Sequence, residues 1–130
     1  MKKLDTRKIK SFKKRDTNRF LHMLTCYDYQ TAKMLDETAL DLILVGDSLG
    51  NVILGYETTL SVTLNDMITF SSAVKRGAKN KFTIVDLPFG TYNTVEEGLK
   101  NATELIQKSG CEAVKLEGAF DHQLELITRL

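Results

Sequence analysis

The chain has 130 residues, a length typical of one domain with a hydrophobic core of its own. Its 18 Lys and Arg residues nearly balance its 17 Asp and Glu residues, so the formal net charge of +1 indicates no particular charged partner. No apolar run approaches the roughly 18 residues that span a membrane, and no signal-peptide core follows the basic start. We therefore expect a cytoplasmic protein with no membrane partner.

The basic residues are concentrated at the N-terminus. Nine of the first twenty residues are Lys or Arg, and Leu4, Ile9 and Phe12 lie among them as apolar contacts. A nucleic-acid-binding arm is one alternative, but no aromatic interleaving or recognition motif supports it. We predict a basic helical segment at residues 1–15, one domain at residues 16–130, and no nucleic-acid partner.

Four apolar segments predict strands, and a segment with helical periodicity follows each of them. Residues 42–45 are apolar without alternation, which is typical of a strand covered by helices on both faces. The predicted strands are residues 20–27, 41–45, 81–86 and 112–117, and the predicted helices are residues 29–38, 64–77, 95–109 and 122–130.

Polar residues before these helices predict their N-caps. Asp28, Thr63, Thr94 and Asp121 each precede one helix, and Asp66 follows Thr63 at capping-box spacing.

The connection between the second strand and the second helix is long. Residues 51–62 are rich in threonine and predict an ordered loop rather than a helix. Gly50 and Gly55 would allow a positive φ or the close approach of a ligand. Cys26 and Cys111 lie far apart in apolar contexts and are predicted to be buried, reduced thiols.

The order of these elements predicts a parallel sheet, because right-handed crossovers would align all four strands. A small doubly wound sheet and half of a (β/α)₈ barrel both fit this order. A complete barrel typically needs roughly 250 residues, so length alone favours the sheet.

Three predicted strands have an acidic residue at their carboxyl end: Asp86 and Glu117 are the last residues of their strands, and Asp47 follows residues 41–45 after one glycine. Because parallel strands end at the same edge, we expect these carboxylates to lie close together, with Ser48 and Lys115 nearby. Their repulsion would raise one pKa or favour a bound divalent cation. Oxygen ligands without His or Cys select a hard cation such as Mg²⁺. Strand alternation places Lys115 on the same face as Glu117, where its ammonium could balance anionic substrate oxygens.

The alternative is that each acid only caps the helix after its strand. One acid would not decide between the two interpretations, but three repetitions favour a shared site. A nucleophilic triad is poorly supported, because His22 lies in a predicted strand and His122 in the last helix, with no evident Ser or Cys partner. No phosphate loop or dinucleotide-binding fingerprint is present.

Six motifs follow one another along the chain after Lys13. They are Thr25-Cys-Tyr-Asp-Tyr29, Val45-Gly-Asp-Ser-Leu-Gly50, Gly55-Tyr56, Thr59-Leu-Ser-Val-Thr63, Asp86-Leu-Pro-Phe89 and Val114-Lys-Leu-Glu-Gly118. Their order and spacing closely resemble those of the ketopantoate hydroxymethyltransferase family.

This resemblance implies a TIM (β/α)₈ barrel, of which residues 16–130 would form the N-terminal half, with about four βα units. The family transfers a hydroxymethyl group from 5,10-methylenetetrahydrofolate to 3-methyl-2-oxobutanoate. The product is 2-dehydropantoate, on the route to pantothenate and coenzyme A, and the reaction proceeds through an enolate stabilised by Mg²⁺. Members form large oligomers, so a homo-oligomer is expected.

The resemblance also implies roles for individual residues. Asp47 and Asp86 correspond to the Mg²⁺ ligands, and Glu117 to an acid that approaches the metal through water. Ser48 and Lys115 match the residues that hold the carboxylate and keto oxygens of the substrate. The implied substrate site therefore comprises Asp47, Ser48, Asp86 and Lys115.

The sequence departs from the family pattern in several places. Phe70-Ser71 stands where many members carry Tyr-His, and Ala119 replaces a frequent second glycine. The family's general base is a glutamate on a later strand, so no catalytic base is assigned within these 130 residues.

Two alternative functions follow from these departures and from the acids. One is a non-catalytic half-barrel that acts as a folding or assembly unit. The other is a Mg²⁺-dependent 2-oxo acid lyase of the phosphoenolpyruvate-mutase type, which explains the acids but not the Asp86-Leu-Pro-Phe89 motif. An isolated half-barrel would expose strand edges, so we expect instability, or pairing with a second copy or a complementary fragment.

Overall fold

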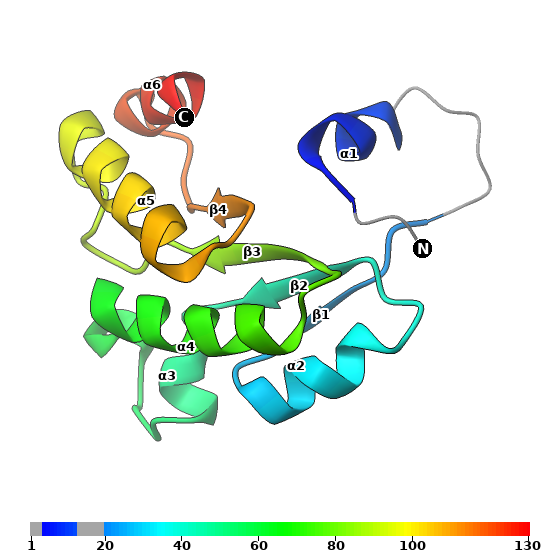
Figure 1. Ribbon diagram of the computed structural model, residues 1–130. Helices are drawn as coiled ribbons and strands as arrows, with labels where there is room; N and C mark the ends of the chain where they lie inside the picture. The colour runs from blue at the N-terminus through cyan, green and yellow to red at the C-terminus, as the bar shows by residue number, and fades with distance from the viewer. Residues whose placement is uncertain (1–3, 13–19) are drawn as a thin grey trace.

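The computed structural model describes residues 4–12 and 20–130, and these residues form one four-stranded sheet with its connecting helices (Figure 1). The strands are β1 (Met23–Thr25), β2 (Leu42–Val45), β3 (Phe82–Asp86) and β4 (Ala113–Lys115). The helices are α1 (Thr6–Phe12), α2 (Tyr29–Asp36), α3 (Leu49–Val52), the 3-10 helix η1 (Thr59–Ser61), α4 (Leu64–Gly77), α5 (Val95–Ser109) and α6 (Asp121–Arg129).

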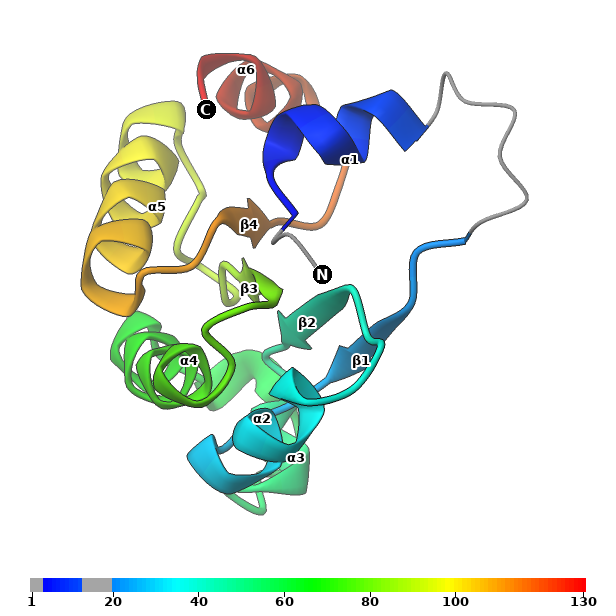
Figure 2. The same ribbon diagram turned by 45° about the vertical axis from the view of Figure 1, so that its right-hand side comes forward.

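The four strands are parallel and stand in sequence order, β1-β2-β3-β4. Figure 2 shows them along an arc, with α2, α4 and α5 on its outer side. A doubly wound sheet would carry helices on both faces. The fold is therefore that of the first four βα units of a (β/α)₈ barrel, as the family resemblance implies. The doubly wound sheet that length alone favours is not found.

The burial of the central strands follows from this arrangement. Ile43, Val45 and Val85 are fully buried on the face that the helices cover. Leu44 and Ile84 alternate with them and are only partly buried. The expectation that helices cover residues 42–45 on both faces is wrong, because the opposite face is the inner face of the arc.

The predicted N-caps are confirmed for three helices. Asp28 and Thr94 each accept a hydrogen bond from the backbone amide three residues later. Thr63 and Asp66 form a capping box, in which each side chain bonds the backbone amide of the other. These interactions join residues three apart in sequence, which is why the local pattern predicts them.

The predicted N-cap of α6 is wrong by one residue. The helix begins at Asp121, so Phe120 and not Asp121 is the N-cap. The Phe120 amide donates to Gln123 Oε1 at 2.9 Å. The start of α6 is therefore held by an uncharged amide side chain from within the helix.

Residues 51–62 are more regular than predicted. They include the end of α3 and all of η1, whereas a loop without helix was expected. Gly55 has a φ of +72°, as its place in the loop allowed. A Cβ at Gly50 would lie 2.5 Å from Val62 Cγ2. Gly50 therefore permits close packing of the chain on itself.

The N-terminal segment is described only in part. α1 carries Arg7, Lys8 and Lys10 of the basic segment predicted at residues 1–15. Residues 1–3 and 13–15 of that segment, and with them the predicted domain boundary, lie outside the described residues. In the described ranges, no helix combines the length and the apolar character that crossing a bilayer requires.

Both cysteines are buried free thiols, as predicted. Burial raises the pKa of the Cys26 and Cys111 thiols, because removal from water disfavours the thiolate. The two side chains belong to the hydrophobic core.

Candidate active site

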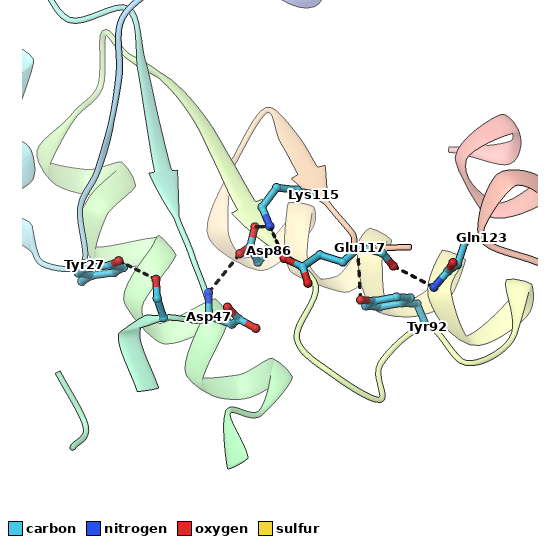
Figure 3. A network of polar contacts seen from close by, with 8 residues as sticks. Tyr27, Asp47, Asp86, Tyr92, Lys115, Glu117 and Gln123 are labelled. Carbon is cyan, nitrogen blue, oxygen red and sulfur yellow. Dashed lines mark hydrogen bonds and ion pairs between the residues drawn. The ribbon is translucent and has the colours of Figure 1, made fainter. Parts of the chain in front are cut away.

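Asp86, the last residue of β3, supplies a buried carboxylate at the carboxyl end of the sheet. Its Oδ1 lies 2.9 Å from Lys115 Nζ, and its Oδ2 accepts a hydrogen bond from the Asp47 amide at 3.3 Å (Figure 3). Burial raises the pKa of the Asp86 carboxyl, because its cost outweighs the stabilisation from Lys115 and the Asp47 amide. Asp86 therefore lies at the centre of a polar cluster built from β3, β4 and the residues that follow β2.

Lys115, the last residue of β4, lies between two of the predicted acids. Its Nζ contacts Glu117 Oε1 at 3.4 Å in addition to Asp86. Burial opposes the charged form of Lys115, but the hydrogen bond and charge of Asp86 outweigh it and raise the pKa. Lys115 thus reduces the repulsion expected between the acids. β4 is shorter than predicted, so Glu117 lies two residues beyond it, in the loop before α6.

Gly46 joins β2 to Asp47 and Ser48, and there is little space for a side chain at this position. A Cβ at Gly46 would lie 3.0 Å from Ser48 Oγ and 3.4 Å from Asp86 Oδ2, so glycine allows these groups to approach. The Ser48 hydroxyl forms a 2.7 Å hydrogen bond with the Tyr27 hydroxyl. Tyr27 was not predicted as a site residue, and its only signal was its position in the first of the six motifs.

None of the three acids caps the helix that follows its strand, so the capping interpretation is wrong. Asp47 meets Asp86 through its backbone amide, and Glu117 meets Lys115 through its carboxylate. The N-caps of the following helices α3, α5 and α6 are Ser48, Thr94 and Phe120.

Four of the five predicted site residues line one pocket of about 180 Å³. They are Asp47, Asp86, Lys115 and Glu117, and Ser48 is not among the lining residues. The pocket also contains residues that the sequence did not predict, from η1 and from the loop between β3 and α5. These are Thr59, Leu60, Leu87, Phe89 and Tyr92.

The donor set of this pocket fits a hard divalent cation. Carboxylate oxygens are present, and no His or Cys side chain is among the lining residues. In the part of the chain described, no three His, Cys, Asp or Glu side chains are grouped so that they could hold one metal ion. Mg²⁺ needs only one or two direct carboxylates and keeps several waters. Asp47 and Asp86, which meet through the Asp47 amide, are the residues suited to hold it.

A larger pocket of about 590 Å³ lies beside β4, and its lining is mostly apolar and not suited to hold a divalent cation. Leu44 and Ile84 of the inner face line it, together with residues of α5 and α6. Lys115 borders both pockets, but none of the three predicted acids borders the larger one. This pocket is therefore the open apolar side of the half-barrel.

The family model described as ketopantoate hydroxymethyltransferase matches residues 3–130 of the chain. The chain belongs to this family. A relative from Listeria innocua is 51% identical over 109 residues, covering 83% of this chain and 39% of the relative. A relative from Syntrophus aciditrophicus is 49% identical over 118 residues, covering 90% of this chain and 43% of the relative. Both are named 3-methyl-2-oxobutanoate hydroxymethyltransferase, and the chain spans about two fifths of their length.

Solved structures confirm the fold of this family member. Two crystal structures of 2,3-dimethylmalate lyase, a member of the PEP mutase/isocitrate lyase superfamily, match it with TM-scores of 0.65 and 0.60. The sequence identities are 16% and 20%, and the matches cover 95% and 77% of this chain but 41% and 35% of the lyase chains. At this identity the likeness shows the barrel arrangement alone.

Proposed function

We propose that this chain supplies the metal-binding and substrate-binding part of a hydroxymethyltransferase active site. The reaction transfers a hydroxymethyl group from 5,10-methylenetetrahydrofolate to 3-methyl-2-oxobutanoate and gives 2-dehydropantoate, a step of pantothenate synthesis. Family membership and relatives of about 50% identity that are named for this activity support the proposal. The single observation that carries it is the meeting of Asp47, Asp86 and Lys115 in one pocket.

Lys115 and Ser48 are suited to hold the 2-oxo acid. The Lys115 ammonium is positively charged and can face an anionic substrate oxygen. Its ion pair with Asp86 holds the ammonium in place from the other side. The Ser48 hydroxyl is oriented by Tyr27. With Tyr27 as the donor of that hydrogen bond, the Ser48 hydrogen remains available for a substrate oxygen.

Asp47 and Asp86 would hold Mg²⁺, with Glu117 as a further acid of the same pocket. When bound, Mg²⁺ acts as a Lewis acid that lowers the energy of negative charge developing on the substrate oxygens. That charge develops when the proton at C3 of the 2-oxo acid is removed. We do not assign the base that removes this proton to any residue of the present chain.

The relatives of about 50% identity favour the transferase over a 2-oxo acid lyase, since the lyases resemble this chain at only 16% and 20% identity. A non-catalytic half-barrel remains the alternative of a different class. It differs from the proposal in one measurable respect, because it would not exchange the C3 proton.

Exchange of the C3 proton of 3-methyl-2-oxobutanoate for deuterium, followed by NMR, tests the proposal. It is measured with Mg²⁺ and with EDTA, on this chain and on this chain extended with the C-terminal part of the Listeria innocua relative. We expect Mg²⁺-dependent exchange by the extended chain, and a loss of roughly 100-fold in the Asp86→Asn variant. Asp121→Asn, which removes an exposed carboxylate of α6, is the matched control and should keep full exchange.

Formation of 2-dehydropantoate from the folate cosubstrate by the same extended chain completes the test. Absence of both exchange and product would refute the proposed function. Exchange that persists in Asp86→Asn would refute the assignment of the site.

A further inference from the structure

The backbone of Glu117 is held more firmly than its side chain. The side chain is 81% exposed, and the ion pair that it makes within the described residues, with Lys115, is 3.4 Å long. An exposed ion pair of this kind restrains a side chain weakly. Whatever places Glu117 at the pocket must therefore act on the loop of residues 117–120, which we call the Glu117 loop.

Side chains from two other elements hold the backbone of Glu117. Its carbonyl oxygen accepts a hydrogen bond from Gln123 Nε2 at 2.9 Å. Its amide donates to the Tyr92 hydroxyl at 3.4 Å. Figure 3 shows Tyr92 and Gln123 meeting the main chain at Glu117, while the carboxylate of Glu117 points toward Lys115.

Gln123 bridges the whole Glu117 loop. Its side chain is buried, and its Oε1 accepts a hydrogen bond from the Phe120 amide at 2.9 Å while its Nε2 binds the Glu117 carbonyl. Both ends of the amide are therefore used. Gly118, between these two contacts, has a φ of +106°, and a Cβ there would overlap the Gln123 amide.

The position of Gln123 is in turn set by the packing of α6 on α5. Leu126, one turn after Gln123, is fully buried. A Cβ on Gly98 of α5 would overlap the end of the Leu126 side chain, so the two helices pack closely there. A buried helix contact thus fixes the amide that holds the Glu117 loop.

We propose that Gln123 is a positioning residue that sets the place of Glu117 at the pocket through the Glu117 backbone, with Tyr92 as a second support. The inference rests on the proposed function, because it gives Glu117 a part in binding the divalent cation. It adds to that function a residue that does not line the pocket.

Two variants separate the contacts of Gln123. Gln123→Leu removes both hydrogen bonds, and Gln123→Glu keeps an acceptor for the Phe120 amide but removes the donor to the Glu117 carbonyl. Gln107→Leu, at an exposed position of α5, is the matched control. Circular dichroism first establishes that each variant is folded. If Gln123→Leu does not fold, Gln123→Glu is used in its place for the metal titration.

Amide hydrogen exchange tests the hydrogen bonds without reference to function. We expect the Phe120 amide to lose protection in Gln123→Leu and to keep it in Gln123→Glu and in Gln107→Leu. Unchanged protection in Gln123→Leu would overturn the inference, whatever the metal does.

Calorimetric titration with Mg²⁺ tests the role toward Glu117, on this chain and on the extended chain described above. We expect both Gln123 variants to raise the Kd by about 10-fold, as for residues that support metal ligands from the outer shell. Because Gln123 acts through Glu117, Gln123→Leu should add nothing in a Glu117→Gln background, whereas an independent structural effect would be additive.

The outcomes are distinguishable. A parent chain that binds Mg²⁺, with Gln123 variants of unchanged Kd or additive effects, overturns the positioning role and leaves the proposed function intact. A parent chain and an extended chain that both fail to bind Mg²⁺ overturn the proposed function and the inference together.

Discussion

Replacement of Lys115 by Met would leave the buried Asp86 carboxylate with the Asp47 amide as its remaining described partner. The cost depends on the burial of each group. The Asp86 side chain is 8% exposed and the Lys115 side chain 38% exposed, so the pair lies between a buried and a surface ion pair. Removing one partner of a buried pair costs roughly 3–5 kcal/mol, and an exposed pair is worth at most about 1 kcal/mol. We therefore expect Lys115→Met to lower the free energy of unfolding by about 2 kcal/mol.

Urea unfolding followed by circular dichroism measures this change. Lys108→Met is the matched control, because it removes a more exposed ion pair with Glu104 on α5 and should cost at most about 0.5 kcal/mol. Asp86→Asn removes the buried charge, so the double variant Lys115→Met/Asp86→Asn should recover most of the loss. A cost equal to that of Lys108→Met, or a double variant less stable than Lys115→Met, would refute the assignment of Asp86 as a buried carboxylate that depends on Lys115.

Three further predictions concern the rest of the molecule. Thr63→Ala removes one half of the capping box of α4 and should lower the free energy of unfolding by about 1 kcal/mol in the same assay; an unchanged urea midpoint would contradict it. Cys26 and Cys111 should react slowly with a thiol reagent in the native chain and rapidly in urea, because burial raises the pKa of both thiols; prompt labelling of the native chain would argue against their burial. The chain should associate in sedimentation experiments, since β1 and β4 are the edges of the described sheet and the pocket beside β4 is apolar; a cooperatively melting monomer would be the opposite result.

Features that depend on neighbouring residues were predicted well from the sequence. The caps at Asp28, Thr63 and Thr94 each join groups three residues apart, and the periodicity of α4 and α5 is a local property. The predicted N-cap of α6 is wrong because a glutamine side chain holds the start of this helix, whereas the residues typical of N-caps are Ser, Thr, Asp and Asn. The sequence predicts no helix in residues 51–62 because α3 and η1 are single short turns without a periodic pattern.

The order of elements does not distinguish a doubly wound sheet from a half-barrel. Both folds alternate strands and helices, and they differ in whether the helices cover one face or two. Of the features in the sequence, the motifs that resemble the family favour the barrel. The family model shows the family, and the sheet order with α2, α4 and α5 on the outer side of the arc shows the fold.

The sequence by itself determined that an acid stands at or within two residues of the end of three strands, because apolar runs and the polar residues that follow them are readable along the chain. Only the tertiary structure decided which groups these acids meet. Asp86 pairs with Lys115 from the neighbouring strand, and Glu117 is held through its backbone by Tyr92 and Gln123. Such contacts depend on the register of β4 with β3 and on the packing of α6 against α5. Register and helix packing are properties of the assembled sheet, and no single stretch of the sequence carries them.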